Sequence, residues 1–147
     1  MINYEVKKRI IAIDYGTKRV GIAISDPFCI FPSVTITIQK DENFFRNLLK
    51  LIVEKNVGKI ILGYPDSDDG KTSKLAEEIL KFKFELENKS KIEIDLRDEH
   101  LTSQMAASRI IDTVSKRSKR RDKSKIDAQA AAILLEEYLN SLEKNMS

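Results

Sequence analysis

The sequence predicts an α/β domain in which helices flank a mixed five-stranded sheet, in the order βββαβαβα plus a C-terminal helix. Two short apolar runs, residues 10–13 and 20–24, are rich in β-branched residues and predict strands. Residues 33–38 alternate apolar and polar side chains, which is typical of a half-exposed third strand. Two later strands alternate with helical segments, which indicates parallel crossovers. The first strand is the most uniformly apolar and is expected at the centre.

The strands are expected at about 9–14, 19–25, 33–38 and 59–63, with a fifth built on the alternation of Ile92, Ile94 and Leu96. The first two strands and their short polar turn form a β-hairpin. The break after the second strand begins at Asp26-Pro27, because a residue before proline is biased away from helix. Phe28, Ile30 and Phe31 then lie in an irregular apolar link.

Helices are predicted from apolar residues at helical spacing. Asp41 is expected to cap the first helix, which ends near Asn56 before a stop at Gly58. The inward residues of this helix are Phe45, Leu48, Leu49 and Ile52. A second helix, capped by Thr72 or Ser73, carries Leu75, Ile79, Leu80, Lys83 and Leu86.

Two further helices complete the chain. One is capped by Thr102 and runs to about Val114. The last begins near Ser124 or Lys125 and continues to about Asn140, after which the tail is expected to fray.

Size and composition favour a single domain covering residues 1–147. Hydrophobic residues make up 41% and charged residues 33% of the chain, which fits a globular protein with a charged surface. The sequence has no run of about 18 apolar residues and no signal-peptide pattern, so a cytoplasmic location is expected. Its single cysteine, Cys29, and single histidine, His100, exclude an internal disulfide and a histidine-based metal site.

Asp14 stands at the end of the first apolar strand, where an ionised carboxylate is costly to bury without a positive partner. Three interpretations of this hairpin stay open. Asp14 holds a divalent cation on the central strand of an RNase H-like nuclease, or the hairpin contacts ATP as in actin and sugar kinases. In the third, Asp14 only caps backbone amides while Gly16 supplies a positive φ. Lys18 or Arg19 is the alternative positive partner.

A basic loop is predicted at residues 116–125, KRSKRRDKSK, with seven basic residues against one acid. This density is typical of a segment that binds phosphates, although a solvated loop kept polar for solubility has the same composition.

Three carboxylates, Asp14, Glu99 and Asp127, are expected to meet at one edge of the sheet. Asp14 ends the first strand, Glu99 follows the fifth, and Asp127 lies in the first turn of the last helix on its inward face. Converging carboxylates repel one another unless a cation joins them, and Mg²⁺ or Mn²⁺ prefers such oxygen ligands. The alternative is that Asp127 complements the helix dipole and Glu99 is a surface acid.

Four segments in order, IDYGTKRVGIAISD, ILGYP, DEHLTS and IDAQAAAILLEEYL, resemble the YqgF family, also called RuvX. The resemblance runs from about Arg9 to Leu139 and implies an RNase H-like nuclease linked with processing of the 5′ end of pre-16S rRNA. Through similarity to RuvC it also implies Holliday-junction resolution. The acidic site of the family carries over to Asp14, Glu99 and Asp127. His100 stands where the family has arginine, which removes a permanent cation near the site.

The predicted function is therefore phosphodiester hydrolysis with Mg²⁺ or Mn²⁺, held by the three carboxylates as catalytic and metal-binding residues. The partners expected are pre-rRNA or branched DNA and the ribosome, with no membrane, and the protein is expected as a monomer or homodimer. A non-catalytic RNA- or ribosome-binding factor is the third class of function. The predicted substrate-binding residues are Thr17, Lys18, Arg19, Thr102, Lys116, Arg117, Lys119, Arg120 and Arg121.

Overall fold

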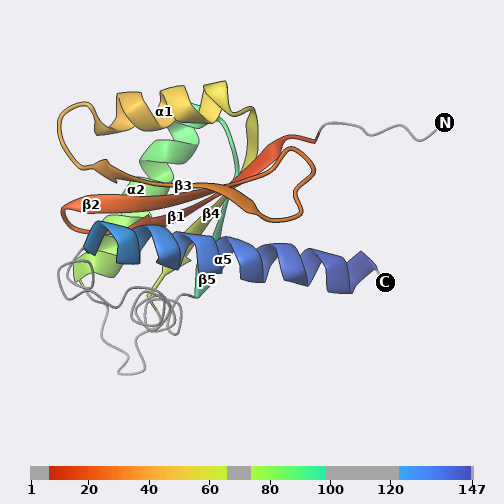
Figure 1. The fold of residues 1–147 in the computed structure, drawn as a ribbon. Coiled ribbons are helices and arrows are strands. Elements are labelled where there is room, and N and C mark those ends of the chain that lie inside the picture. The colour runs from red at the N-terminus through yellow and green to blue at the C-terminus, as the bar shows by residue number, and fades with distance from the viewer. Residues whose placement is uncertain (1–6, 66–73, 99–122, 147) are drawn as a thin grey trace.

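A computed structural model of the chain describes residues 7–65, 74–98 and 123–146 (Figure 1). Within these residues the elements are β1 (Arg9–Tyr15), β2 (Arg19–Ser25), β3 (Pro32–Gln39), α1 (Phe44–Glu54), β4 (Val57–Tyr64), α2 (Lys74–Ser90), β5 (Ile94–Asp98) and α5 (Lys123–Met146). The helix expected at 102–114, with its cap Thr102, and the caps Thr72 and Ser73 lie outside the described residues.

The five strands form one mixed sheet in the order β3-β2-β1-β4-β5. β1 pairs antiparallel with β2 and parallel with β4, β2 pairs antiparallel with β3, and β4 pairs parallel with β5. The central position predicted for β1 is confirmed, because Ile11, Ala12 and Ile13 have no exposed surface. A strand covered on both faces can be apolar along its whole length, which is why its sequence does not alternate.

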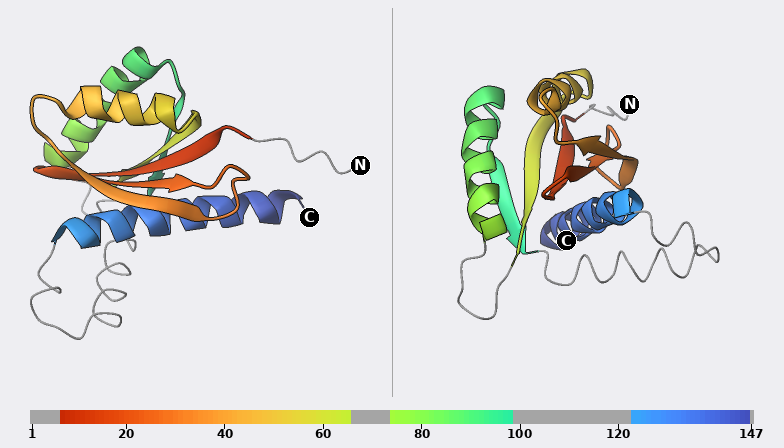
Figure 2. Two further views of the ribbon diagram at one scale, coloured as in Figure 1. Left: turned by 45° about the horizontal axis from the view of Figure 1, so that its top comes forward. Right: turned by 90° about the vertical axis from the view of Figure 1, so that its left-hand side faces the viewer.

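Helices cover both faces of the sheet (Figure 2). α1 and α2 pack against the face that carries Ile11 and Ile13, while α5 crosses the face that carries Ile10 and Ala12. Successive side chains of a strand point to opposite faces of the sheet, so the face on which each residue of β1 lies follows from its position relative to Ile10 and Ile11. We call the second surface the α5 face.

The first helix begins later than expected and uses a different cap. Asn43 occupies the N-cap position without a side-chain hydrogen bond, while the Asp41 carboxylate accepts from the Asn43 backbone N–H at 2.9 Å. Gly58, expected as a stop, lies inside β4, and the chain turns instead at Asn56 with φ 52°. Asparagine adopts the left-handed region more readily than most residues, so the turn falls at Asn56, before the strand.

The buried face of α2 differs in part from the prediction. Ile79 and Leu86 are buried as expected, but Phe82 takes the central position and Leu80 is 43% exposed. Phe82 packs against the rings of Tyr15, Phe44 and Phe45, with centroids 4.7, 5.8 and 5.8 Å away. This aromatic cluster selects Phe82 for the core, because large rings bury more apolar area than a leucine.

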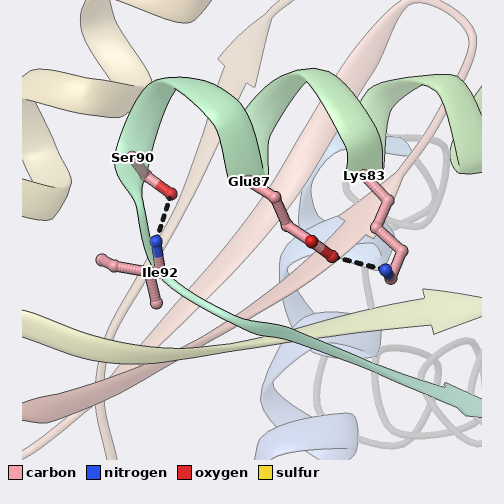
Figure 3. Close-up of polar contacts among 4 residues, drawn as sticks. All are labelled: Lys83, Glu87, Ser90 and Ile92. Carbon is pink, nitrogen blue, oxygen red and sulfur yellow. Dashed lines mark hydrogen bonds and ion pairs between the residues drawn. The ribbon is translucent and has the colours of Figure 1, made fainter.

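The end of α2 is fixed by polar contacts along its last turns (Figure 3). Lys83 and Glu87 form an ion pair one turn apart, and the Ser90 hydroxyl accepts from the Ile92 backbone N–H at 3.2 Å. Lys91 leaves the helix with φ 61°. The strand therefore begins at Ile94, and Ile92, which was expected in it, belongs to the connection.

The last helix is longer at both ends than the sequence indicated. α5 begins at Lys123, so the predicted basic loop loses its last three residues to the helix. It continues to Met146, and the expected fraying after Asn140 is wrong for the backbone. None of the helices in the described part of the chain combines the length and hydropathy needed to cross a membrane.

Candidate active site

The β1–β2 hairpin closes through a tight turn at Gly16. The Gly16 N–H donates to the Arg19 carbonyl at 3.1 Å, and a Cβ at position 16 would lie 2.5 Å from that oxygen. The φ of Gly16 lies outside the left-handed region, so the expected positive φ is wrong. Glycine is needed because the backbone of Arg19 comes too close for any side chain.

Asp14 belongs to the α5 face. It follows Ile10 and Ala12 at two-residue intervals, and both of these pack on that face. In the antiparallel ladder Asp14 stands directly opposite Gly21 of β2. Cross-strand partners place their side chains on the same side of the sheet, roughly 5 Å apart at Cβ. The Asp14 carboxylate is therefore next to the space that the missing side chain of Gly21 leaves open.

Asp127 enters from α5 into that same space. A Cβ built on Gly21 would lie 2.1 Å from the Asp127 carbonyl oxygen and 2.4 Å from its carbonyl carbon. The helix backbone thus rests on the strand at Gly21, which sets Asp127 beside the Asp14–Gly21 pair. Gly21 was not among the predicted site residues. The signal for it was a glycine within an otherwise apolar strand, which often marks the close approach of another backbone.

Arg19 fixes the side chain of Asp127. Its Nε donates to Oδ2 of Asp127 at 2.9 Å, and the two side chains are 23% and 26% exposed. α5 begins at Lys123, one or two residues earlier than predicted, so Asp127 is not in the first helical turn. The alternative interpretation as a dipole partner loses its basis, because that effect is confined to the first turn.

Beside this pair lies a cavity of about 350 Å³, lined by Gly16, Thr17, Lys18, Arg19 and Asp127. The predicted substrate-binding residues of the hairpin are thus gathered around one predicted catalytic carboxylate. Thr17 and Lys18 are exposed, so a ligand can reach them from solvent.

β5 ends at the same level as β1. Ile13 is paired with Leu62, and Leu62 is paired with Leu96, so Asp98 lies level with Tyr15 two strands away. Strands lie about 4.8 Å apart, which puts the two strand ends roughly 10 Å from each other. Glu99, the next residue along the chain, lies outside the described residues. The same holds for Thr102, His100, Lys116, Arg117, Lys119, Arg120 and Arg121.

The donor set fits a divalent cation in its chemistry. Asp14 and Asp127 offer carboxylate oxygens on one face of the sheet, the ligand type that Mg²⁺ and Mn²⁺ prefer. Over residues 7–65, 74–98 and 123–146 no group of three His, Cys, Asp or Glu residues is placed to hold a metal ion. Glu99 is the third donor that the sequence predicts, and it lies outside the described residues.

The mixed five-stranded sheet with helices on both faces defines an RNase H-like fold. The fold is similar to that of Thermus thermophilus RuvC in complex with a Holliday junction substrate, with TM-score 0.59 and 9% identity over 92% of this chain and 96% of that one. It is also similar to the fowlpox virus Holliday junction resolvase, with TM-score 0.55 and 17% identity over 91% of this chain and 99% of that one.

Sequence comparison then gives the family. The model of the RuvX family, described as Holliday junction resolvase, matches residues 8–141. A protein of Prosthecochloris aestuarii is 34% identical over 92% of this chain and 96% of its own length. One from Chlorobium phaeobacteroides is 39% identical over 91% and 93%. Both carry the name "Putative pre-16S rRNA nuclease". The chain belongs to the RuvX (YqgF) family, as its motifs indicated.

Proposed function

We propose that this protein is a metal-dependent endonuclease that hydrolyses a phosphodiester bond in pre-16S rRNA, acting as one domain over residues 1–147. The observation that supports the proposal is that Gly21 is the strand partner of Asp14 and lies against the backbone of Asp127, beside a cavity lined by Lys18 and Arg19. The nuclease names of the relatives and the resolvase description of the family support hydrolysis. A cytoplasmic location is proposed because ribosomes are assembled in the cytoplasm.

Asp14, Asp127 and Glu99 are the proposed ligands of Mg²⁺ or Mn²⁺. When bound, the ions supply an activated water and stabilise the leaving oxygen. The surrounding residues hold the Asp14 and Asp127 carboxylates in position. β1 holds Asp14 at a half-buried strand end, and the Arg19 side chain holds Asp127 in one orientation. Gly21 lets the helix approach closely enough for the two acids to share a site.

The hairpin cavity is the proposed phosphate-binding site. Thr17 offers a hydroxyl donor, and Lys18 and Arg19 offer positive charge beside Asp127. Thr102 and the basic residues at 116–121 are proposed to extend these contacts along the strand. Neutralising those basic residues is expected to flatten the salt dependence of binding, since each lost phosphate contact lowers the slope by roughly 0.7 for a single strand.

Asp14→Asn is the direct test of catalysis. The variant keeps the shape of the side chain but loses the charge that attracts a cation, so cleavage of RNA with Mn²⁺ is expected to fall below detection. Asp95→Asn is the matched control, because Asp95 is a carboxylate of β5 whose side chain accepts from Arg97. Equal cleavage by wild type and Asp14→Asn protein, with both folded, would contradict the proposal.

Holliday-junction cleavage is the second candidate function. It is favoured by the likeness in fold to RuvC bound to a junction. The same two acids and cavity serve either substrate, because both present phosphodiesters. A non-catalytic role in binding RNA or the ribosome is the third, and an inactive but RNA-binding wild-type protein would favour it.

A further inference from the structure

The connection between β2 and β3 exposes an unusual amount of apolar surface. Phe28, Ile30 and Phe31 are 43%, 59% and 54% exposed and stand within four residues of one another. We call these three side chains the apolar tip. Apolar patches that stay exposed to solvent in a folded protein often mark sites of interaction with a partner.

The tip is held by a buried carboxylate. Asp26, only 5% exposed, accepts backbone N–H groups of Phe28 at 3.1 Å, Ile30 at 2.7 Å and Phe31 at 2.9 Å. Burial opposes the charge of Asp26, but these hydrogen bonds outweigh it and lower the pKa of the carboxyl below its ordinary value. The connection is therefore built to hold its backbone in one conformation.

Cys29 anchors the connection to the rest of the molecule. It adopts φ 57°, its thiol donates to the Lys8 carbonyl at 3.3 Å, and its side chain packs against the core of the α5 face. Because Cys29 turns inward, the neighbouring Phe28 and Ile30 stay at the surface. The exposed apolar groups thus result from specific packing of the residue between them.

The backbone of two lysines runs beside the tip. The Lys7 N–H donates to the Pro27 carbonyl at 3.1 Å, and the Lys8 carbonyl accepts from Cys29, so the first two described residues run along the connection. Both lysine side chains are exposed. Exposed aromatic rings next to lysines are the combination with which proteins bind single-stranded nucleic acid.

The tip stands at the opposite end of β2 from the candidate active site. Figure 2 shows the connection after β2 at the end of the sheet where the N-terminus enters, away from the start of α5. β2 spans seven residues, Arg19–Ser25, which corresponds to about 20 Å at the rise of a strand.

We propose that the apolar tip is a second contact for nucleic acid, on which unpaired bases stack while the same strand passes to the hairpin cavity. The inference rests on the proposed function, since it needs the substrate to be a nucleic acid. A strand at helical spacing covers 20 Å in roughly six nucleotides, so only oligonucleotides of that length or more reach both sites. A second copy of the chain fits the tip less well, because a two-fold interface there would bring Lys7 and Lys8 towards their own copies.

The test compares binding of two single-stranded RNAs, one of roughly twelve nucleotides and one of about four, to full-length protein carrying Asp14→Asn so that neither is cleaved. Adding Phe28→Ala and Phe31→Ala is expected to weaken binding of the long RNA about tenfold, as loss of base stacking does, and to leave the short RNA unchanged. Phe84→Ala is the matched control, since Phe84 is 70% exposed on α2. Its effect on both RNAs is expected to be negligible.

Unchanged binding of the long RNA, or equal loss for both RNAs, would overturn the inference. So would a wild-type dimer in sedimentation that the tip variant converts to monomer, because the tip would then be a subunit interface. Cleavage by wild-type protein separates the two proposals. Cleavage without a length effect refutes only the tip, and a length effect without cleavage refutes only the catalytic proposal.

Discussion

Gly21 positions the candidate active site although it has no side chain of its own. Its Cβ would overlap the backbone of Asp127, and its strand partner is Asp14. The sequence pointed to the two acids because a carboxylate at the end of an apolar strand, or on the inward face of a helix, is costly to desolvate unless a positive group binds it. Sequence analysis missed Gly21 because a glycine in an apolar strand indicates a close approach but does not identify the partner, which here lies more than a hundred positions away.

Gly21→Ala tests this contact. The clash is with backbone atoms, so α5 must move away, and we expect a loss of about 1–3 kcal/mol in the free energy of unfolding. We also expect a marked fall in cleavage rate. Denaturant unfolding and steady-state kinetics measure the two effects. Gly58→Ala is the comparison, because it adds the same methyl group at the other end of the sheet against Lys8; a similar loss of activity there would contradict the site-specific explanation.

Asp26 predicts a pH dependence. Since the folded-state pKa of Asp26 is lowered, its contribution is complete above the unfolded pKa near 4 and is lost as pH falls through the lower folded value. Asp26→Ala removes acceptors for three backbone N–H groups, so we expect a loss of about 2–4 kcal/mol at neutral pH. The difference between wild type and variant should shrink when unfolding is measured at about pH 3. A difference that stays constant over this range would show that charge plays no part.

At the scale of elements, strands were predicted more closely than helices. Short apolar runs bounded by polar turns give strand positions almost directly, and Arg19–Ser25 coincides with the predicted second strand. Helix faces and ends depend on partners elsewhere in the chain. Leu80 and Phe82 both fit an apolar pattern, and only the rings of the aromatic cluster decide in favour of Phe82.

The two phenylalanines of α2 allow the stability contributed by the aromatic cluster to be measured with an internal control. Phe82 is 4% exposed and Phe84 is 70% exposed on the same helix. Phe82→Ala is expected to cost about 3–5 kcal/mol in the free energy of unfolding, as for other buried aromatic residues. Phe84→Ala is expected to change it by less than about 0.5 kcal/mol. Comparable losses in thermal unfolding would mean that the aromatic cluster is not the core contact of this helix.

At the scale of the whole molecule, the mixed sheet and the central place of β1 were predicted from the sequence, whereas the full strand order was not. The most uniformly apolar strand takes the centre, and the lengths of the connections decide which neighbours are antiparallel. Strand ends and helix faces predicted that Asp14 and Asp127 lie near one another, and the Asp127 backbone does lie against Gly21, the strand partner of Asp14. Their role as metal ligands is a proposal. The place of Glu99 stays a prediction. Oligomeric state could not be predicted, because surface composition alone does not show which patch meets another chain.

The mass of the protein in solution and its cleavage products together distinguish an RNA substrate from a four-way DNA junction. Resolving a four-way junction requires two symmetric active sites, whereas cutting one RNA strand requires one. We expect cleavage of pre-16S rRNA by a species with the 16.8 kDa mass of a single chain, measured by light scattering and a gel assay. Paired cuts in a four-way DNA by a species of twice that mass would favour the resolvase function instead.

The position of Asp127 on the C-terminal helix has a consequence for biosynthesis. Strands β1 to β4 are synthesised well before α5, whereas a domain generally folds as a unit. A nascent chain that has already formed its hairpin still lacks one of the two acids. The proposed metal site is therefore completed only once α5 has packed against the sheet.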